Sequence, residues 1–74
     1  MKTGMLWFDN DPKADLDEKV NKAAAYYTRK YGQRPDLCYV HPSMVKEEQT
    51  ARKGMSIQLN QTVLPNHFWI GING

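Results

Sequence analysis

The residues of this chain that could do chemistry are one cysteine, two histidines and a run of aspartates. Cys38 stands three residues before His41 in "PDLCYVHPSM". A thiol beside an imidazole could serve as a nucleophile with its base, or as two ligands of a metal ion. In a regular strand these two side chains diverge, because alternate residues point to opposite faces of the sheet. We therefore predict that Cys38 is a small core residue beneath a helix, as free cysteines commonly are.

Four aspartates follow the first apolar run, in "WFDNDPKADLD". The spacing suggests a calcium loop, but the sixth position of an EF-hand loop would be Ala14 instead of glycine, and the twelfth Val20 instead of glutamate. We predict that the carboxylates serve as turn and helix-cap residues, with a weak magnesium or calcium site at Asp9 and Asp11 as the alternative. The four residues are Asp9, Asp11, Asp15 and Asp17.

The second histidine, His67, falls on the same predicted sheet face as His41. If their strands are neighbours, the two imidazoles converge and offer two metal ligands. A closed zinc site needs four ligands, and the sequence offers no obvious third. We therefore predict strand-end histidines that face solvent or an interface, with no metal site.

Length and composition indicate one small domain, residues 1–74. A chain of 74 residues buries only about 60% of the surface of its unfolded form, so its core is small. A hydrophobic fraction of 41% is typical of a globular domain, and a net charge of +2 does not by itself indicate nucleic acid or a membrane. A single cysteine excludes an internal disulfide and favours a cytoplasmic location. We expect neither a signal peptide nor a transmembrane helix.

Residues 16–31 have the signals of an amphipathic helix. Asp15 is placed as the N-cap, with Glu18 as its capping-box partner three residues later. Gly32 supplies the left-handed stop, and Pro35 lies just beyond it. Apolar residues between these signals recur at i, i+4 and i+7 and form one stripe. The stripe consists of Leu16, Val20, Ala23, Ala24, Tyr27 and Tyr31.

Alternation and turn residues predict strands in four further runs, "MLWF", "DLCYVH", "GMSIQLN" and "HFWIGI". Segment 43–53 is predicted as a short second helix; the alternative is a loose or partly disordered segment, because its apolar stripe consists only of Met44, Val45 and Ala51. The strand–helix–strand order implies a right-handed parallel crossover, and we expect the last two strands, joined by a turn at Pro65-Asn66, to form an antiparallel hairpin. The predicted fold is an α/β (α+β) domain of two layers, β-α-β-(α)-β-β, with one mixed sheet of about four strands and one main helix on one face.

The alternation divides the predicted strand residues into two unlike faces. One face is uniformly apolar and matches the helix stripe: Leu6, Phe8, Cys38, Val40, Met55, Ile57, Leu59, Phe68, Ile70 and Ile72. The other mixes aromatic and polar residues: Met5, Trp7, Leu37, Tyr39, His41, Ser56, Gln58, His67 and Trp69. Both helices are expected on the first face, and exposed aromatic patches mark interaction surfaces. We predict partner binding through Trp7, Tyr39, His41, His67 and Trp69; the alternative is that these aromatics only shield the sheet.

One flank of the helix gathers basic residues around a tyrosine. At about 100° per residue they lie beside the buried stripe, and such a row can follow a phosphate backbone. The ordinary alternative is a solvated face. The flank consists of Lys19, Lys22, Tyr26, Arg29 and Lys30.

The run "YGQRPDLCYVHPSMV" followed by "GMSIQLNQTVLPNHFWIGI" resembles small uncharacterised proteins of bacterial mobile elements and prophages. It is also similar to the axial-domain region of tailed-phage capsid proteins, in which a helix ends near Gly and Pro, a strand ends in Asn/His-Pro, and a Gly-initiated strand leads to a turn and a closing strand. The resemblance covers about half the chain and implies the same strands and self-association. The chain lacks the long spine helix and the peripheral domain of the capsid fold.

These observations favour a small, non-catalytic binding domain. We predict no catalytic residue and no cofactor. The expected partner is a second copy, giving a homodimer, or another protein docked on the aromatic sheet face. The alternative is an accessory nucleic-acid-binding protein that uses the basic helix flank. No membrane partner is expected.

Overall fold

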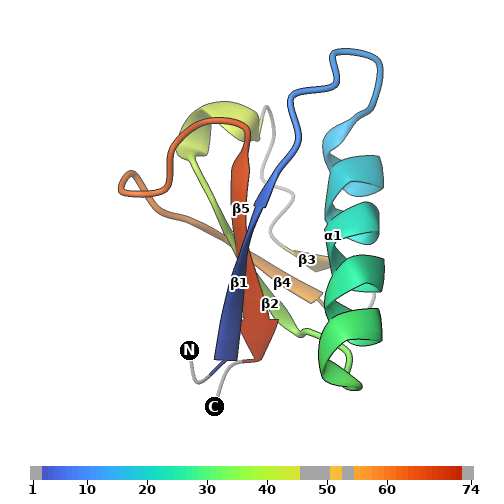
Figure 1. Cartoon of the computed structure of the whole chain (residues 1–74). Coiled ribbons are helices and arrows are strands. Elements are labelled where there is room, and N and C mark those ends of the chain that lie inside the picture. The colour runs from blue at the N-terminus through green and yellow to red at the C-terminus, as the bar shows by residue number, and fades with distance from the viewer. Residues whose placement is uncertain (1–2, 46–50, 53–54, 73–74) are drawn as a thin grey trace.

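A computed structural model describes residues 3–45, 51–52 and 55–72 of the chain. One helix packs against a single sheet, and the first and last described residues, Thr3 and Ile72, are paired at the same end of the domain (Figure 1). The predicted two-layer α+β fold is confirmed. The elements in chain order are β1 (Thr3–Phe8), α1 (Leu16–Tyr31), β2 (Leu37–Val40), the 3-10 helix η1 (Pro42–Met44), β3 (Ala51–Arg52), β4 (Met55–Leu59) and β5 (His67–Ile72).

The sheet is mixed, with the strand order β1-β5-β2-β4-β3. β5 is antiparallel to both β1 and β2, so β1 and β2 run in the same direction with β5 between them. The crossover from β1 through α1 to β2 is therefore parallel but spans two strand positions. The predicted hairpin of the last two strands is wrong, because β4 pairs parallel with β2 and β2 separates it from β5. The connection 60–66 is long enough to carry the chain past β2.

The main helix has the predicted bounds and caps. The Asp15 carboxylate accepts a hydrogen bond from the Glu18 N–H at 2.9 Å, which satisfies one of the N–H groups left without a partner in the first turn. At the other end Gly32 is left-handed, with φ 74°, and its N–H donates to the Thr28 carbonyl at 2.8 Å. These local signals do not depend on tertiary packing, which is why the sequence was sufficient to place both ends.

The second helix predicted over 43–53 is not what the described residues form. Pro42–Met44 make a single 3-10 turn, capped by the His41 side chain, and Ala51–Arg52 form a short strand against β4. Residues 46–50 and 53–54 of this prediction lie outside the described residues. The segment has few apolar residues to hold a helix against the sheet, and isolated short helices are marginal in water.

The core lies between α1 and one face of the sheet. The helix contributes the buried apolar residues Val20, Ala23 and Tyr27, and Tyr27 is fully buried. Cys38 and Phe68 lie beneath it with no exposed surface. The predicted apolar set of β2, β4 and β5 therefore faces the helix, with the other fully or nearly buried members being Val40, Met55, Ile57 and Ile70.

The faces predicted for β1 are wrong. The strand register places Trp7 opposite Phe68, and thus on the helix face, where its ring lies 5.2 Å from the ring of Tyr26. Leu6 is opposite Trp69 and points to the other face. Both alternating sets of β1 are apolar, so alternation alone could not say which set meets the helix. The set assigned to the open face by the structure is Leu6 and Phe8, which are 57% and 56% exposed.

Candidate binding surface

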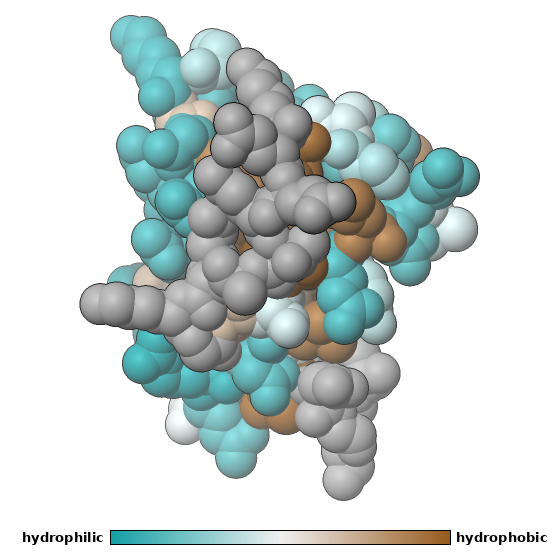
Figure 2. Space-filling view, turned by 180° about the vertical axis from the view of Figure 1, so that it is seen from behind, coloured by the Kyte–Doolittle hydropathy of each residue, from teal (hydrophilic) through white to brown (hydrophobic). Residues whose placement is uncertain are grey.

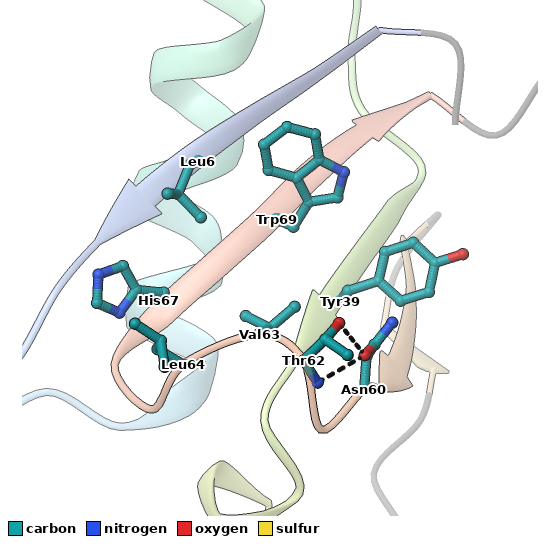
Figure 3. A pocket seen from close by; sticks show the side chains of 8 residues that line it. All are labelled: Leu6, Tyr39, Asn60, Thr62, Val63, Leu64, His67 and Trp69. Carbon is teal, nitrogen blue, oxygen red and sulfur yellow. Dashed lines mark hydrogen bonds between the residues drawn. The ribbon is translucent and has the colours of Figure 1, made fainter.

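The sheet face away from α1 carries a hollow of about 640 Å³. Three neighbouring strands contribute to it, with Leu6 from β1, Trp69 and His67 from β5, and Tyr39 from β2 (Figure 3). The register explains the grouping, because Trp69 is opposite Leu6 on one side and opposite Tyr39 on the other. Cross-strand neighbours on one face lie within side-chain reach, so the three side chains form a continuous row.

The connection between β4 and β5 forms the remaining wall of the hollow. Asn60 anchors it, since its N–H donates to the Val40 carbonyl at 2.8 Å and its side-chain oxygen accepts from the Thr62 N–H at 2.9 Å. The second half is a turn in which the His67 N–H donates to the Leu64 carbonyl at 3.1 Å. Asn66 is left-handed there, with φ 67°, so the predicted turn at Pro65-Asn66 is confirmed. This ordered connection holds Val63 and Leu64 at the hollow (Figure 3).

Four large apolar side chains on this face or at its rim are exposed: Leu6, Phe8, Leu64 and Trp69. Leu64 is the most exposed of them, at 64%. Figure 2 shows the molecule from behind, where apolar areas of the described surface stand between hydrophilic side chains. We name the residues Leu6, Phe8, Tyr39, Val63, Leu64, His67 and Trp69 the open-face surface. Since the described residues that line the hollow include no Asp, Glu, Lys or Arg, the hollow suits an uncharged, apolar ligand group.

The two histidines are opposed in register, but each makes its own local contacts. His41 continues the β2 register opposite His67, yet its Nδ1 accepts a hydrogen bond from the Ser43 N–H at 3.1 Å. His67 packs its ring against Phe8 on the β1 side, at 4.9 Å, and its Nδ1 donates to the Pro65 carbonyl at 3.0 Å. Both rings are thus used locally, and among the described residues no three His, Cys, Asp or Glu side chains are placed to hold a metal ion.

Cys38 lies in the core, as its strand alternation predicts. It has no exposed surface, and burial raises the pKa of its thiol to about 12. The thiolate is the reactive form of cysteine, so this thiol is unreactive in the folded protein near neutral pH.

The aspartates hold the chain between β1 and α1 in shape. Asp9 accepts a hydrogen bond from the Asp11 N–H at 3.1 Å, and Asp11 accepts one from the Lys13 N–H at 2.9 Å. These are turns closed by an aspartate side chain, and Asp15 follows as the helix cap. The predicted roles as turn and cap residues are confirmed for Asp9, Asp11 and Asp15.

The predicted basic flank of α1 is only partly exposed. Lys19 is just 7% exposed and lines a second hollow, of about 680 Å³, between the start of α1 and η1. Tyr26 packs against Trp7, and Lys30 lies over the ring of Tyr31, 5.4 Å from its centre. The exposed cations of the flank are Lys22, Arg29 and Lys30, of which Lys30 contacts Tyr31.

The sequence prediction missed most of the hollow. Leu6 was assigned to the wrong face, Asn60 was predicted as the end of a strand, and Val63 and Leu64 were treated as a plain connection. One signal was present, since two adjacent apolar residues next to a Pro-Asn turn are unusual in a solvated loop. Of the five predicted partner-binding residues, Tyr39, His67 and Trp69 line the hollow; Trp7 lies on the helix face and His41 caps η1.

Fold and surface together define a small two-layer α+β domain in which, among the described residues, a helix covers one face of the sheet and the other face carries the hollow. Comparison with known protein families, with curated proteins and with solved structures found no match. The resemblance to mobile-element and phage proteins stays a prediction. Within the described ranges, no helix has the length and apolar character needed to cross a membrane.

Proposed function

We propose that this chain is a non-catalytic binding domain that docks an apolar segment of a protein partner in the hollow of the open-face surface. The observation that carries the proposal is the gathering of exposed Leu6, Leu64 and Trp69 around a hollow on a sheet face that α1 does not cover. Exposed apolar patches of this kind mark interaction sites.

The chemistry of the hollow supports an apolar protein segment as its ligand. Trp69 and Leu64 offer apolar contact, and aromatic residues carry much of the energy of protein interfaces. Tyr39, Asn60 and His67 add a few polar groups at the rim, which can orient a backbone. We place this binding in the cytoplasm, in keeping with the single cysteine.

Peptide selection on the folded domain tests the proposal. Random twelve-residue peptides displayed on a carrier are selected against the wild-type chain, and we expect enriched sequences rich in leucine and aromatic residues. Binding of a synthesised peptide should fall at least tenfold on Trp69→Ser or Leu64→Ser. Leu59→Ser is the matched control, because Leu59 is 48% exposed but alternates onto the helix face of the sheet. Peptides that bind all variants equally would contradict the proposal.

Variants of the helix flank, compared with Trp69→Ser, test the alternative, nucleic-acid binding by that flank. A labelled single-stranded oligonucleotide is titrated at low salt. Affinity that falls steeply with salt and is lost on Lys22→Gln and Arg29→Gln, while Trp69→Ser leaves it unchanged, would favour the helix flank over the open-face surface.

A further inference from the structure

We propose that two copies of this chain join edge to edge through β1, antiparallel and about a two-fold axis at Leu6. The proposal goes beyond docking in the hollow, because it concerns the outer edge of the sheet and names a second copy as the partner. It can therefore fail while docking in the hollow stands, and the reverse is also true.

The two edges of the sheet differ in what they offer a partner. β3 is a described strand of two residues, whereas β1 has six, four of them the apolar run Met5, Leu6, Trp7 and Phe8. Short edge strands, prolines and charges are the usual means by which proteins prevent edge pairing. β1 has none of them, and no described strand pairs with its outer edge.

The hydrogen-bond pattern shows which backbone groups of β1 point outward. The Asp9 N–H donates to the Asn66 carbonyl at 2.9 Å, directly beyond the pair of Phe8 and His67. Bonded and non-bonded pairs alternate along an antiparallel ladder, so Trp7 and Met5 also bond to β5. The N–H and C=O groups of Gly4, Leu6 and Phe8 therefore face away from β5, toward the free edge.

One register uses all three outward-facing residues of both copies. In it Leu6 lies opposite Leu6 of the second copy, and Gly4 lies opposite Phe8 in both directions, giving three hydrogen-bonded pairs. A two-fold axis requires this reciprocity. The register also gives the Phe8 ring room, since glycine has no side chain and an aromatic residue placed across from an edge glycine covers its backbone. Phe8, 56% exposed in one copy, would lose much of that exposure.

The charge of β1 and the area that two copies bury determine how strongly the edge dimer is expected to associate. Thr3–Phe8 contains no charged residue, so two copies meet without like charges opposite each other. One strand from each copy buries roughly several hundred Å², below the ~1,200–2,000 Å² of stable specific interfaces. The dimer is therefore expected to be reversible, with the population depending on protein concentration.

Opposite charges placed at Leu6 test both the edge and the axis. Molar mass is measured by light scattering from low to high protein concentration. We expect the wild type to rise from 8.6 kDa toward twice that mass, and Leu6→Lys or Leu6→Glu alone to stay near the monomer mass. An equimolar mixture of the two variants should regain the dimer, and lose it again at high salt, because only residues facing each other across the axis can pair in this way.

Controls separate this proposal from docking in the hollow. Leu59→Lys and Leu59→Glu place the same charges at an exposed leucine of β4 and should leave the concentration dependence unchanged. Far-UV circular dichroism verifies that the Leu6 variants fold. A wild type that stays monomeric at every concentration, single-charge variants that dimerise like it, or a mixture that fails to pair would each overturn the edge dimer. Leu6 also lines the hollow, so its variants can weaken peptide binding as well as the edge pairing. Trp69→Ser leaves β1 unchanged and separates the two proposals: it should abolish peptide binding and leave the concentration dependence of the mass unchanged, and loss of the dimer on Trp69→Ser would overturn the edge dimer.

Discussion

The two faces of the sheet carry the same kinds of aromatic side chain, but α1 covers one face and leaves the other more exposed. The chain has two tryptophans and two phenylalanines, and each face receives one of each. Trp7 and Phe68 are paired across β1 and β5 beneath the helix, whereas Phe8 and Trp69, their neighbours in the chain, point to the open face. The residue types on the two faces are matched. A difference in stability or solvent access between matched residues therefore measures how well α1 covers one face.

The largest expected difference is between the two phenylalanines. Phe68→Ala should lower the free energy of unfolding by about 3–5 kcal/mol, since Phe68 has no exposed surface and its loss leaves a cavity. Phe8→Ala should cost under about 1 kcal/mol, because more than half of its side chain already meets water. Urea unfolding at a protein concentration low enough to exclude association measures both. Equal costs would mean that the two faces are equally covered.

A second difference appears at alkaline pH, on the covered face alone. The unfolded chain releases the Cys38 proton near pH 9.0, but burial holds the pKa of the folded thiol at about 12. Above pH 9 the unfolded state binds fewer protons than the folded state, so stability falls as pH rises, by up to about 1.4 kcal/mol per pH unit.

The alkaline difference is measured as the change in urea midpoint between pH 8 and pH 10. Cys38→Ala is the control, because it keeps Tyr27, the phenol whose pKa is raised by burial and then by Tyr31 and Asp36. The wild type should lose more stability over this interval than Cys38→Ala does. Parallel losses would show that the thiol is already open to water in the folded state.

The sequence predicted the covered face better than the open one, for a physical reason. The caps of α1 are local, so Asp15 and Gly32 fixed its ends without knowledge of the rest of the fold. In β2 and β5 one alternating set is clearly more apolar than the other, and Cys38 and Phe68 were placed correctly beneath the helix. In β1 both sets are apolar, and the wrong one was chosen. A strand's own pattern cannot resolve that choice, which the pairing with β5 decides.

Local sequence patterns could not predict the strand order or the hollow either. β4 and β5 are consecutive in the chain, and consecutive strands usually pair, yet β2 lies between them. The hollow depends on this arrangement, because the connection 60–66 must pass β2 before it can bring Leu64 near Leu6. Only long-range pairings place these two residues together.

The smallest expected change in stability is that of replacing Trp7, the tryptophan on the covered face. The Trp7 Nε1–H is buried without a hydrogen-bond partner among the described residues, so Trp7→Phe removes an unsatisfied donor while it loses some packing volume. The two effects oppose each other, and the change in unfolding free energy should stay within about 1 kcal/mol.

Fluorescence then reads the two faces separately, because each tryptophan-to-phenylalanine variant keeps one indole. Trp69→Phe leaves Trp7, which the helix face shields and which should emit at shorter wavelength and resist quenching by acrylamide. Trp7→Phe leaves Trp69, 38% exposed and lining the hollow, which should be quenched more strongly. A peptide that enters the hollow should protect Trp69 and leave Trp7 unchanged. If Trp7 were quenched as strongly as Trp69, β1 would have the opposite face toward the helix, and Leu6 and Phe8 would belong to the core instead of the open-face surface.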